Sequence, residues 1–161
     1  MAIYVKFSGG SAITGEVKAT GYTDFVEFGS MQWGVGRGFA SAVGTTGNRS
    51  TSAPSVSEVT LSKVADKASV ALLQAVLTDP PNQTVEIHVA LQDGTELKDF
   101  IVFTLENTGI SGYSVSSGGE KPSESLSLNF TKFTWKYCVY TDKGVSADSP
   151  SVSYDLTTVS K

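Results

Sequence analysis

The residue types that could support catalysis are few and widely separated. His88 is the only histidine and lies on the polar phase of an alternating run. A catalytic triad would need an apposed serine or cysteine and a carboxylate, and no spacing singles these out. Cys138 is the only cysteine and lies in the apolar run Tyr137–Tyr140. We therefore predict a solvent- or interface-facing His88, a buried and unreactive Cys138, and no enzyme activity.

The sequence signals for a metal site, a phosphate site and a pair of catalytic carboxylates are equally weak. One histidine and one cysteine would need spaced carboxylates to complete a zinc site, and no such cluster exists in the sequence. The run Gly34-Val35-Gly36-Arg37-Gly38 lacks the Gly-Lys-Ser/Thr ending of a phosphate loop, and no predicted helix follows it. Asp24 and Glu27 lie three residues apart, and strand residues at that spacing face opposite sides, so they are poor candidates for a paired acid and base. We expect no cofactor and no metal.

Composition excludes other classes of partner. The chain has 161 residues, a formal charge of −4 and a pI near 4.9, which is unlike a protein that binds nucleic acid or anionic membranes. No apolar run approaches the length of a membrane span. The first residues, MAIYVKFSGG, lack the basic and apolar regions of a Sec signal. We therefore expect no membrane insertion, and any export must not depend on such a signal.

Most of the chain alternates between apolar and polar residues, which predicts half-buried strands. The strong segments are 3–7, 85–91, 101–105, 126–130, 133–137 and 152–156, and weaker ones are 25–33, 56–64 and 110–116. The apolar phase shifts by one residue between Phe130 and Phe133. A bulge near Thr131–Lys132 would keep both sets on the core face, and without one the second set would be exposed.

One short helix and three turns complete the predicted elements. Leu72, Leu73, Val76 and Leu77 recur at helical spacing between a cap at Asp66 or Ser69 and the stop Asp79-Pro80. Turn signals lie at Asp93-Gly94, Gly118-Gly119 and Asp142-Lys143-Gly144. Many short strands and one helix indicate a mainly β fold, a single small β-barrel of two packed antiparallel sheets with one short flanking α-helix. We predict one domain spanning 1–161, with a long extended loop at 34–55.

Several segments resemble the haemolysin co-regulated protein (Hcp) family of the bacterial type VI secretion system. They occur in family order and cover nearly the whole chain, and the run from Ile110 to Gly119 followed by ESLSLNF is the most specific. The others are TDFVEF at 23–28, MQWGVGRG at 31–38, APSVSEV at 53–59, DKAS at 66–69 and the ending Thr131-Lys132. The segments 43–51, 78–83 and 140–150 depart from the family pattern.

The resemblance implies a barrel similar to phage tail tube proteins, six copies in a ring, and rings stacked into an inner tube. A sheath would surround the tube, a spike would cap it, and sheath contraction would expel it, with effectors carried in the lumen. The protein would assemble in the bacterial cytoplasm and be secreted without a Sec signal. The chain ends at Lys161, just past the last predicted strand, so we expect no additional C-terminal toxin domain.

The resemblance also implies roles for particular residues. If Trp33 packs into the core, Gln32 faces the other way, where the resemblance implies the lumen wall and contact with cargo. The loop at 34–55, with Gly34, Val35, Gly36, Arg37, Gly38 and Arg49, would contact the neighbouring ring. A small-molecule-binding barrel remains the alternative, with Trp33, Trp135 and Tyr154 lining a closed pocket.

Overall fold

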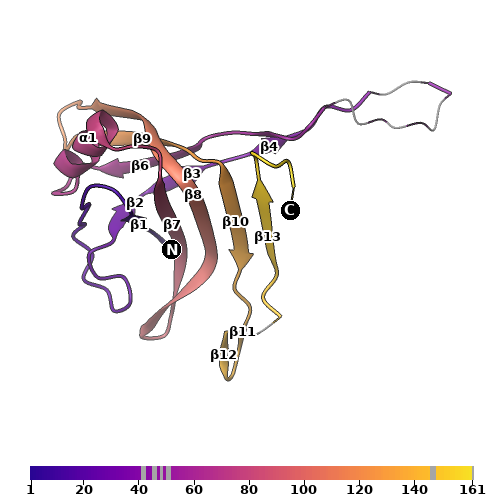
Figure 1. The fold of residues 1–161 in the computed structure, drawn as a ribbon. Coiled ribbons are helices and arrows are strands. Elements are labelled where there is room, and N and C mark those ends of the chain that lie inside the picture. Colours follow the sequence, from indigo (N-terminus) through magenta and orange to yellow (C-terminus); the bar gives the residue numbers. More distant parts are fainter. Residues whose placement is uncertain (41–42, 45–46, 48, 50–51, 146–147, 161) are drawn as a thin grey trace.

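The computed structural model contains thirteen strands and one helix, arranged as two packed sheets from which one long arm projects (Figure 1). It describes residues 1–40, 43–44, 47, 49, 52–145 and 148–160. The elements are β1 (Ala2–Ser8), β2 (Val26–Phe28), β3 (Ser30–Gln32), β4 (Val35–Gly36), β5 (Ser55–Val56), β6 (Val59–Val64), α1 (Ser69–Thr78), β7 (Gln83–Asp93), β8 (Glu96–Ser116), β9 (Ser123–Asn129), β10 (Lys132–Tyr137), β11 (Tyr140–Thr141), β12 (Gly144–Val145) and β13 (Ser151–Asp155).

The strands form one bent path in the order β2-β1-β7-β8-β9-β6-β3, and β10 and β13 extend from β8. The amino-terminal part of β8 pairs with β7 and β10, and its carboxy-terminal part pairs with β9. The ends β2 and β3 meet through Gly29, whose N–H donates to Ser62 O at 2.8 Å. The two packed sheets are confirmed, but the ladder of strand pairs along this path is not closed, so the barrel is incomplete.

The bend in β8 has a local cause at Asn107 and Gly109. Asn107 has a φ of +49°, a left-handed conformation that asparagine tolerates better than β-branched residues. Its Nδ2 donates to Thr131 Oγ1 at 3.1 Å. A Cβ on Gly109 would lie 2.9 Å from the Cβ of Pro81, so only glycine fits without a shift. The two strand segments predicted at 101–105 and 110–116 are therefore one bent strand.

The main core lies between the sheets. Val5, Ile87 and Phe103 from one sheet meet Leu61, Leu126 and Leu128 from the other. Helix α1 adds Leu72 to this core. Alternation along each strand places these residues on the inner face, as the sequence pattern predicts.

Neither alternative for Thr131–Lys132 is correct, because β9 ends at Asn129 and a separate strand, β10, begins at Lys132. The chain leaves one sheet and enters the other at this point, so both phases of the apolar pattern reach the core. Phe130 and Phe133 are buried, whereas Tyr137 at the end of β10 is exposed.

Candidate lumen and assembly surfaces

The outer face of β3, β6, β9 and the end of β8 is lined with hydroxyl groups. Cross-strand register places Ser30 beside Ser62, Ser62 beside Ser125, and Ser125 beside Ser114. The next row begins with Gln32, which pairs with Thr60. This set of two rows, here the hydroxyl face, spans four neighbouring strands.

Gln32 lies on this face and points away from Trp33, the orientation predicted from strand alternation, and its place on a lumen wall stays a prediction. Its side chain is exposed, and the next residue, Trp33, packs against the main core. A surface hollow of about 520 Å³ beside Gln32 is lined by Met31, Trp33, Ser57, Glu58 and Thr60 as well. The alternation of the strand therefore separates a core aromatic from a surface amide.

The two rows of the hydroxyl face carry no charged side chain, because the two charged side chains of β6 and β9 point inward. The carboxylate of Glu58, just before β6, lies beside the second row and accepts hydrogen bonds from Ser111 and Asn129. Lys63 and Glu124 are cross-strand partners, and both are buried. Lys63 Nζ lies 2.9 Å from Glu124 Oε2 and 2.8 Å from Asp66 Oδ1. Tyr113 donates its hydroxyl to Glu124 Oε1 at 2.7 Å. Such a pair is tolerated in a core only when its polar atoms are satisfied in this way.

This buried network shifts the pKa of its members. Burial raises the pKa of Glu124, but hydrogen bonds from Ser69, Tyr113 and Lys63 outweigh burial and hold it below its usual value. Burial and the bond to Glu124 raise the pKa of Tyr113 to about 12. The network joins β6, β8 and β9 to the start of α1. Sequence reasoning missed it, because a Lys or Glu on a strand normally predicts a solvent-facing position.

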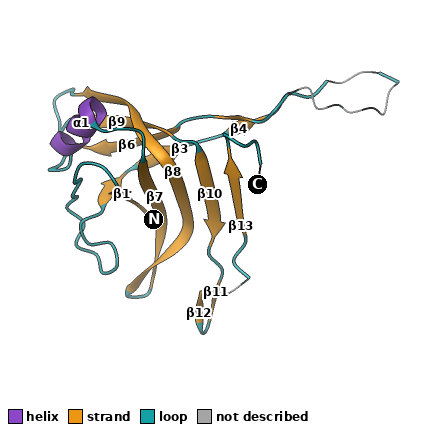
Figure 2. Ribbon diagram, in the orientation of Figure 1, coloured by secondary structure: helices purple, strands orange, loops and turns teal. Residues whose placement is uncertain are grey.

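The described residues of segment 34–55 form an arm that projects from the body (Figures 1 and 2). Its base is a two-stranded ladder, in which Val35 pairs with Val56 and Gly36 with Ser55. Further out, Ala40 N donates to Arg49 O at 2.8 Å. The stretch that the sequence indicated as an irregular loop therefore begins as a hairpin. Positions 41–42, 45–46, 48 and 50–51 of the predicted loop lie outside the described residues.

The predicted stacking residues lie along this arm. Gly34 exchanges hydrogen bonds with Ser57, and Gly38 N donates to Ser52 Oγ at 3.2 Å. The Arg37 guanidinium lies 5.6 Å from the centre of the Phe39 ring. The outgoing segment of the arm carries Gly34, Val35, Gly36, Arg37 and Gly38, of which Val35 and Gly36 form β4. Arg49 lies on the returning segment, before β5.

His88 is more enclosed than predicted. Its side chain is 16% exposed, and Nδ1 lies 3.0 Å from Asp99 Oδ2. The rings of Tyr22 and Phe25 lie within 6 Å of the imidazole, because the segment between β1 and β2 folds over this face of the sheet. The solvent-facing half of the prediction is therefore wrong, since a covering segment far away in sequence was not visible in the strand pattern, and the interface-facing half stays a prediction.

The His88 cluster lacks an accessible nucleophile. Tyr22 donates its hydroxyl to Asp99 Oδ1 at 2.6 Å. Burial and this bond raise the pKa of Tyr22 well above its usual value, so its phenol stays protonated. Burial raises the pKa of Asp99, but bonds from His88 and Tyr22 lower it more, so its carboxyl is held ionised. The arrangement holds the covering segment against the sheet.

The structure does not bring together a reactive cysteine, a metal site or a closed aromatic pocket in the described residues. Cys138 is buried, as predicted, and burial raises the pKa of its thiol. Among the described residues, no three metal-ligating side chains lie together. Trp33 packs against Trp135 with ring centres 5.6 Å apart, and Tyr154 packs on Phe133, so these aromatics fill the core instead of lining a closed pocket.

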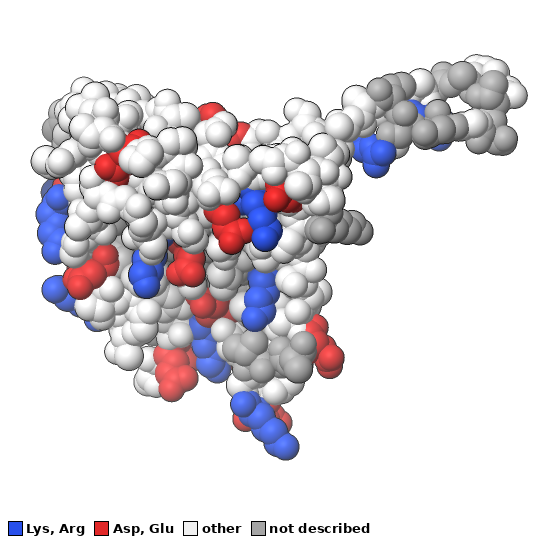
Figure 3. Space-filling model, in the orientation of Figure 1, with Lys and Arg blue, Asp and Glu red and all other residues white. Residues whose placement is uncertain are grey.

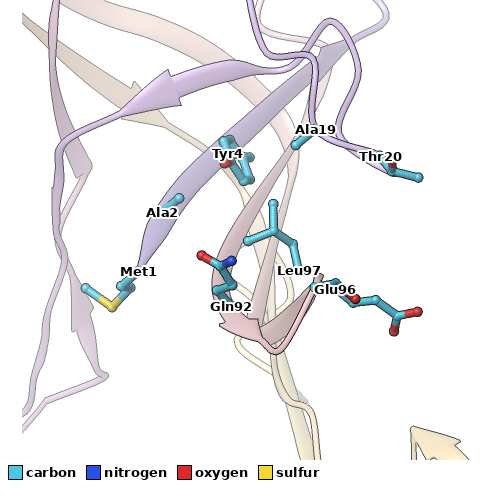
Figure 4. Close-up of a pocket in the computed structure, with 9 residues that line it drawn as sticks. Met1, Ala2, Tyr4, Ala19, Thr20, Gln92, Glu96 and Leu97 are labelled. Atoms are coloured by element: carbon cyan, nitrogen blue, oxygen red, sulfur yellow. The ribbon is translucent and has the colours of Figure 1, made fainter.

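A further hollow lies at the other end of the molecule from α1 (Figures 1 and 4). It has a volume of about 760 Å³ and a mixed lining of Met1, Ala2, Tyr4, Ala19, Thr20, Gln92, Thr95, Glu96 and Leu97. Glu96 is its only charged side chain, and in Figure 4 its carboxylate points away from the other lining residues. The hollow therefore has no set of convergent polar groups of the kind that fixes a small ligand.

Comparison with known proteins decides the family. The family model described as "Type VI secretion system effector, Hcp" matches residues 4–137. The chain belongs to the Hcp family. This family builds type VI secretion tubes, so the chain is a tube component. No curated protein matches the chain.

Solved structures agree with the Hcp fold. A "type six secretion system protein" has a TM-score of 0.81 at 22% identity, covering 98% of this chain and 96% of that one. A type VI secretion system effector from Yersinia pestis has a TM-score of 0.69 at 21% identity, covering 95% and 98%. Hcp1 from Salmonella typhimurium has a TM-score of 0.68 at 18% identity, covering 98% and 95%. At these identities the likeness supports the fold alone.

Among the described residues, no helix has both the length and the apolar character that crossing a membrane requires.

Proposed function

We propose that this Hcp protein forms hexameric rings that stack into the inner tube of a type VI secretion system. The tube would be assembled in the bacterial cytoplasm inside a contractile sheath, capped by a spike protein, and expelled on contraction. The chain acts as a structural part and carrier of effector cargo and is not an enzyme.

The hydroxyl face carries the proposal. A lumen wall must be wetted and must contact cargo without holding it permanently. Serine, threonine and glutamine provide weak, exchangeable hydrogen bonds, whereas a charged wall would bind oppositely charged cargo strongly. Because the side chains of Lys63 and Glu124 point inward, their charges are absent from the two rows of this wall. Gln32, at the edge of the face, is the proposed cargo contact.

The arm 34–55 provides the proposed contact between rings. It extends away from the body, so it can reach another copy without disturbing either sheet. A closed ring uses one pair of lateral surfaces on each subunit, and stacking needs a further contact. The small residues Gly34, Gly36 and Gly38 allow close approach of the backbone.

Native mass spectrometry and negative-stain electron microscopy of the purified protein test this proposal. We expect a hexamer with a central hole, and tubes at higher concentration. Deleting Thr45–Thr51, or Arg37→Glu, should abolish tubes and secretion while single rings remain, and Arg37→Lys is the charge-preserving control. A protein that stays monomeric at micromolar concentration would refute the hexamer, and tubes that survive both changes would refute the stacking role.

A further inference from the structure

Helix α1 has an apolar stripe on its outer side. Val70, Leu73 and Leu77 are between 44% and 76% exposed, and their spacing places them on one face. The opposite side of the helix contributes Leu72 and Ala75 to the interior. None of the ten residues from Ser69 to Thr78 is charged. A solvent-facing helix normally carries charged residues on its outer face, so this stripe is suited to a cover from another molecule.

The arm carries exposed apolar side chains and a positive charge, which complement an apolar and acidic surface. Val35 and Phe39 are 51% and 61% exposed, and Val43 is fully exposed. Arg37 and Arg49 are the only charged residues between 34 and 55. The arm therefore has a formal charge of +2, whereas the rest of the chain, with ten basic and sixteen acidic residues, has −6. In Figure 3 the charged side chains visible on the arm are blue, that is, basic.

An acidic hollow adjoins the start of α1. Its volume is about 510 Å³, and its charged lining residues are Glu16, Glu27, Asp66 and Lys121. Glu16 is fixed next to the helix, because its Oε1 accepts a hydrogen bond from Lys67 N at 3.3 Å. Apolar and acidic surfaces thus lie side by side on the body, as apolar and basic residues do on the arm.

The two surfaces cannot meet within one chain. Figure 1 shows α1 on one side of the body and the arm projecting from the opposite side. Complementary surfaces on opposite sides of a subunit produce a head-to-tail contact between copies. The seven described residues 34–40 reach roughly 23 Å when extended, more than the roughly 15 Å length of a ten-residue helix.

We infer that the arm of one copy docks on the α1 stripe and the adjoining acidic hollow of a second copy. Phe39 and Val43 cover Val70, Leu73 and Leu77, while Arg37 faces Glu16 and Glu27. This inference rests on the proposed tube function and identifies the acceptor surface of its stacking arm.

Disulfide cross-linking between two distinguishable chains tests the contact. A chain with Phe39→Cys is co-expressed with a chain of different mass that carries Val70→Cys, Leu73→Cys or Leu77→Cys. Background is low because the native Cys138 is buried and its thiol pKa is raised. The matched control is Lys143→Cys, an exposed position at the end of the body away from α1. We expect at least one stripe position to give ten times more mixed disulfide than the control.

A charge exchange provides the second measurement. Arg37→Glu should reduce the mixed disulfide at least fivefold, and adding Glu16→Arg to the acceptor chain should restore it. If rings and tubes are visible by electron microscopy but no stripe position exceeds the Lys143→Cys control, the docking inference is refuted and the proposed function stands. If no rings form, both are refuted.

Discussion

Replacing Lys63 with methionine should strongly destabilise the protein. The side chains of Lys63 and Glu124 are 2% and 3% exposed, and their charges lie 2.9 Å apart. Methionine fills most of the lysine volume but leaves the Glu124 carboxylate buried without its cation. Removing one partner of a buried ion pair costs about 3–5 kcal/mol. We therefore expect the free energy of unfolding to fall by about that amount.

Urea denaturation followed by tryptophan fluorescence measures this change, because Trp33 and Trp135 pack in the core and report its loss. With a slope of about 2 kcal/mol per molar, the unfolding midpoint should fall by roughly 1.5–2.5 M. Chain concentration must be the same for each variant, since oligomerisation adds to apparent stability.

Two variants complete the test. Lys132→Met removes a half-exposed partner of Glu106, with Nζ and Oε2 3.1 Å apart, and should cost less than about 1 kcal/mol. Adding Glu124→Leu to Lys63→Met removes the unpaired charge and should recover most of the loss. A Lys63→Met shift no larger than that of Lys132→Met would refute the reasoning.

Three further outcomes are expected. Gln32→Arg should leave the hexamer intact and reduce effector co-purification, and unchanged retention would contradict the cargo role. Asn107→Val should cost about 1–3 kcal/mol in urea denaturation, because valine disfavours a φ of +49°, whereas Asn107→Gly should cost less. The folded-state pKa of Glu124 lies below its usual 4.5, so its stabilisation should be complete above that pH and be lost as pH falls below it. Glu124→Gln should weaken this acid dependence in denaturation at pH 3–7.

Alternation predicts most of the fold because burial on one face is a local property of each strand. The strands containing Ile3–Phe7 and Val85–Leu91 and the two-residue turns at Gly94 and Lys143 are confirmed. The continuity of β8 was not predictable in this way, because Asn107 and Gly109 are turn signals in isolation. Pairing with β7, β9 and β10 outweighs that local preference, so the strand bends at these residues but does not end there.

In the candidate surfaces, too, features set by local alternation were predictable and features set by distant segments were not. The alternation of Gln32 and Trp33 is local, so the sequence predicts which one faces outward, and the structure agrees. The environments of His88 and Lys63 depend on segments distant in sequence. His88 is enclosed by Tyr22 and Phe25, and Lys63 is paired with Glu124, 61 residues away. Periodicity cannot encode such partners.

The inward-facing ion pair and the outward-facing hydroxyl groups have a common physical basis. On β6 and β9, the ordinary arrangement would place Lys63 and Glu124 on the outer face and save the cost of burying them. Their burial is tolerated because Asp66, Ser69 and Tyr113 satisfy the network, which also fixes the start of α1. One network thereby removes charge from the proposed lumen wall and positions the helix that we propose as the acceptor for the arm. Mutations at Lys63 should therefore affect assembly as well as stability, even though its side chain reaches neither surface.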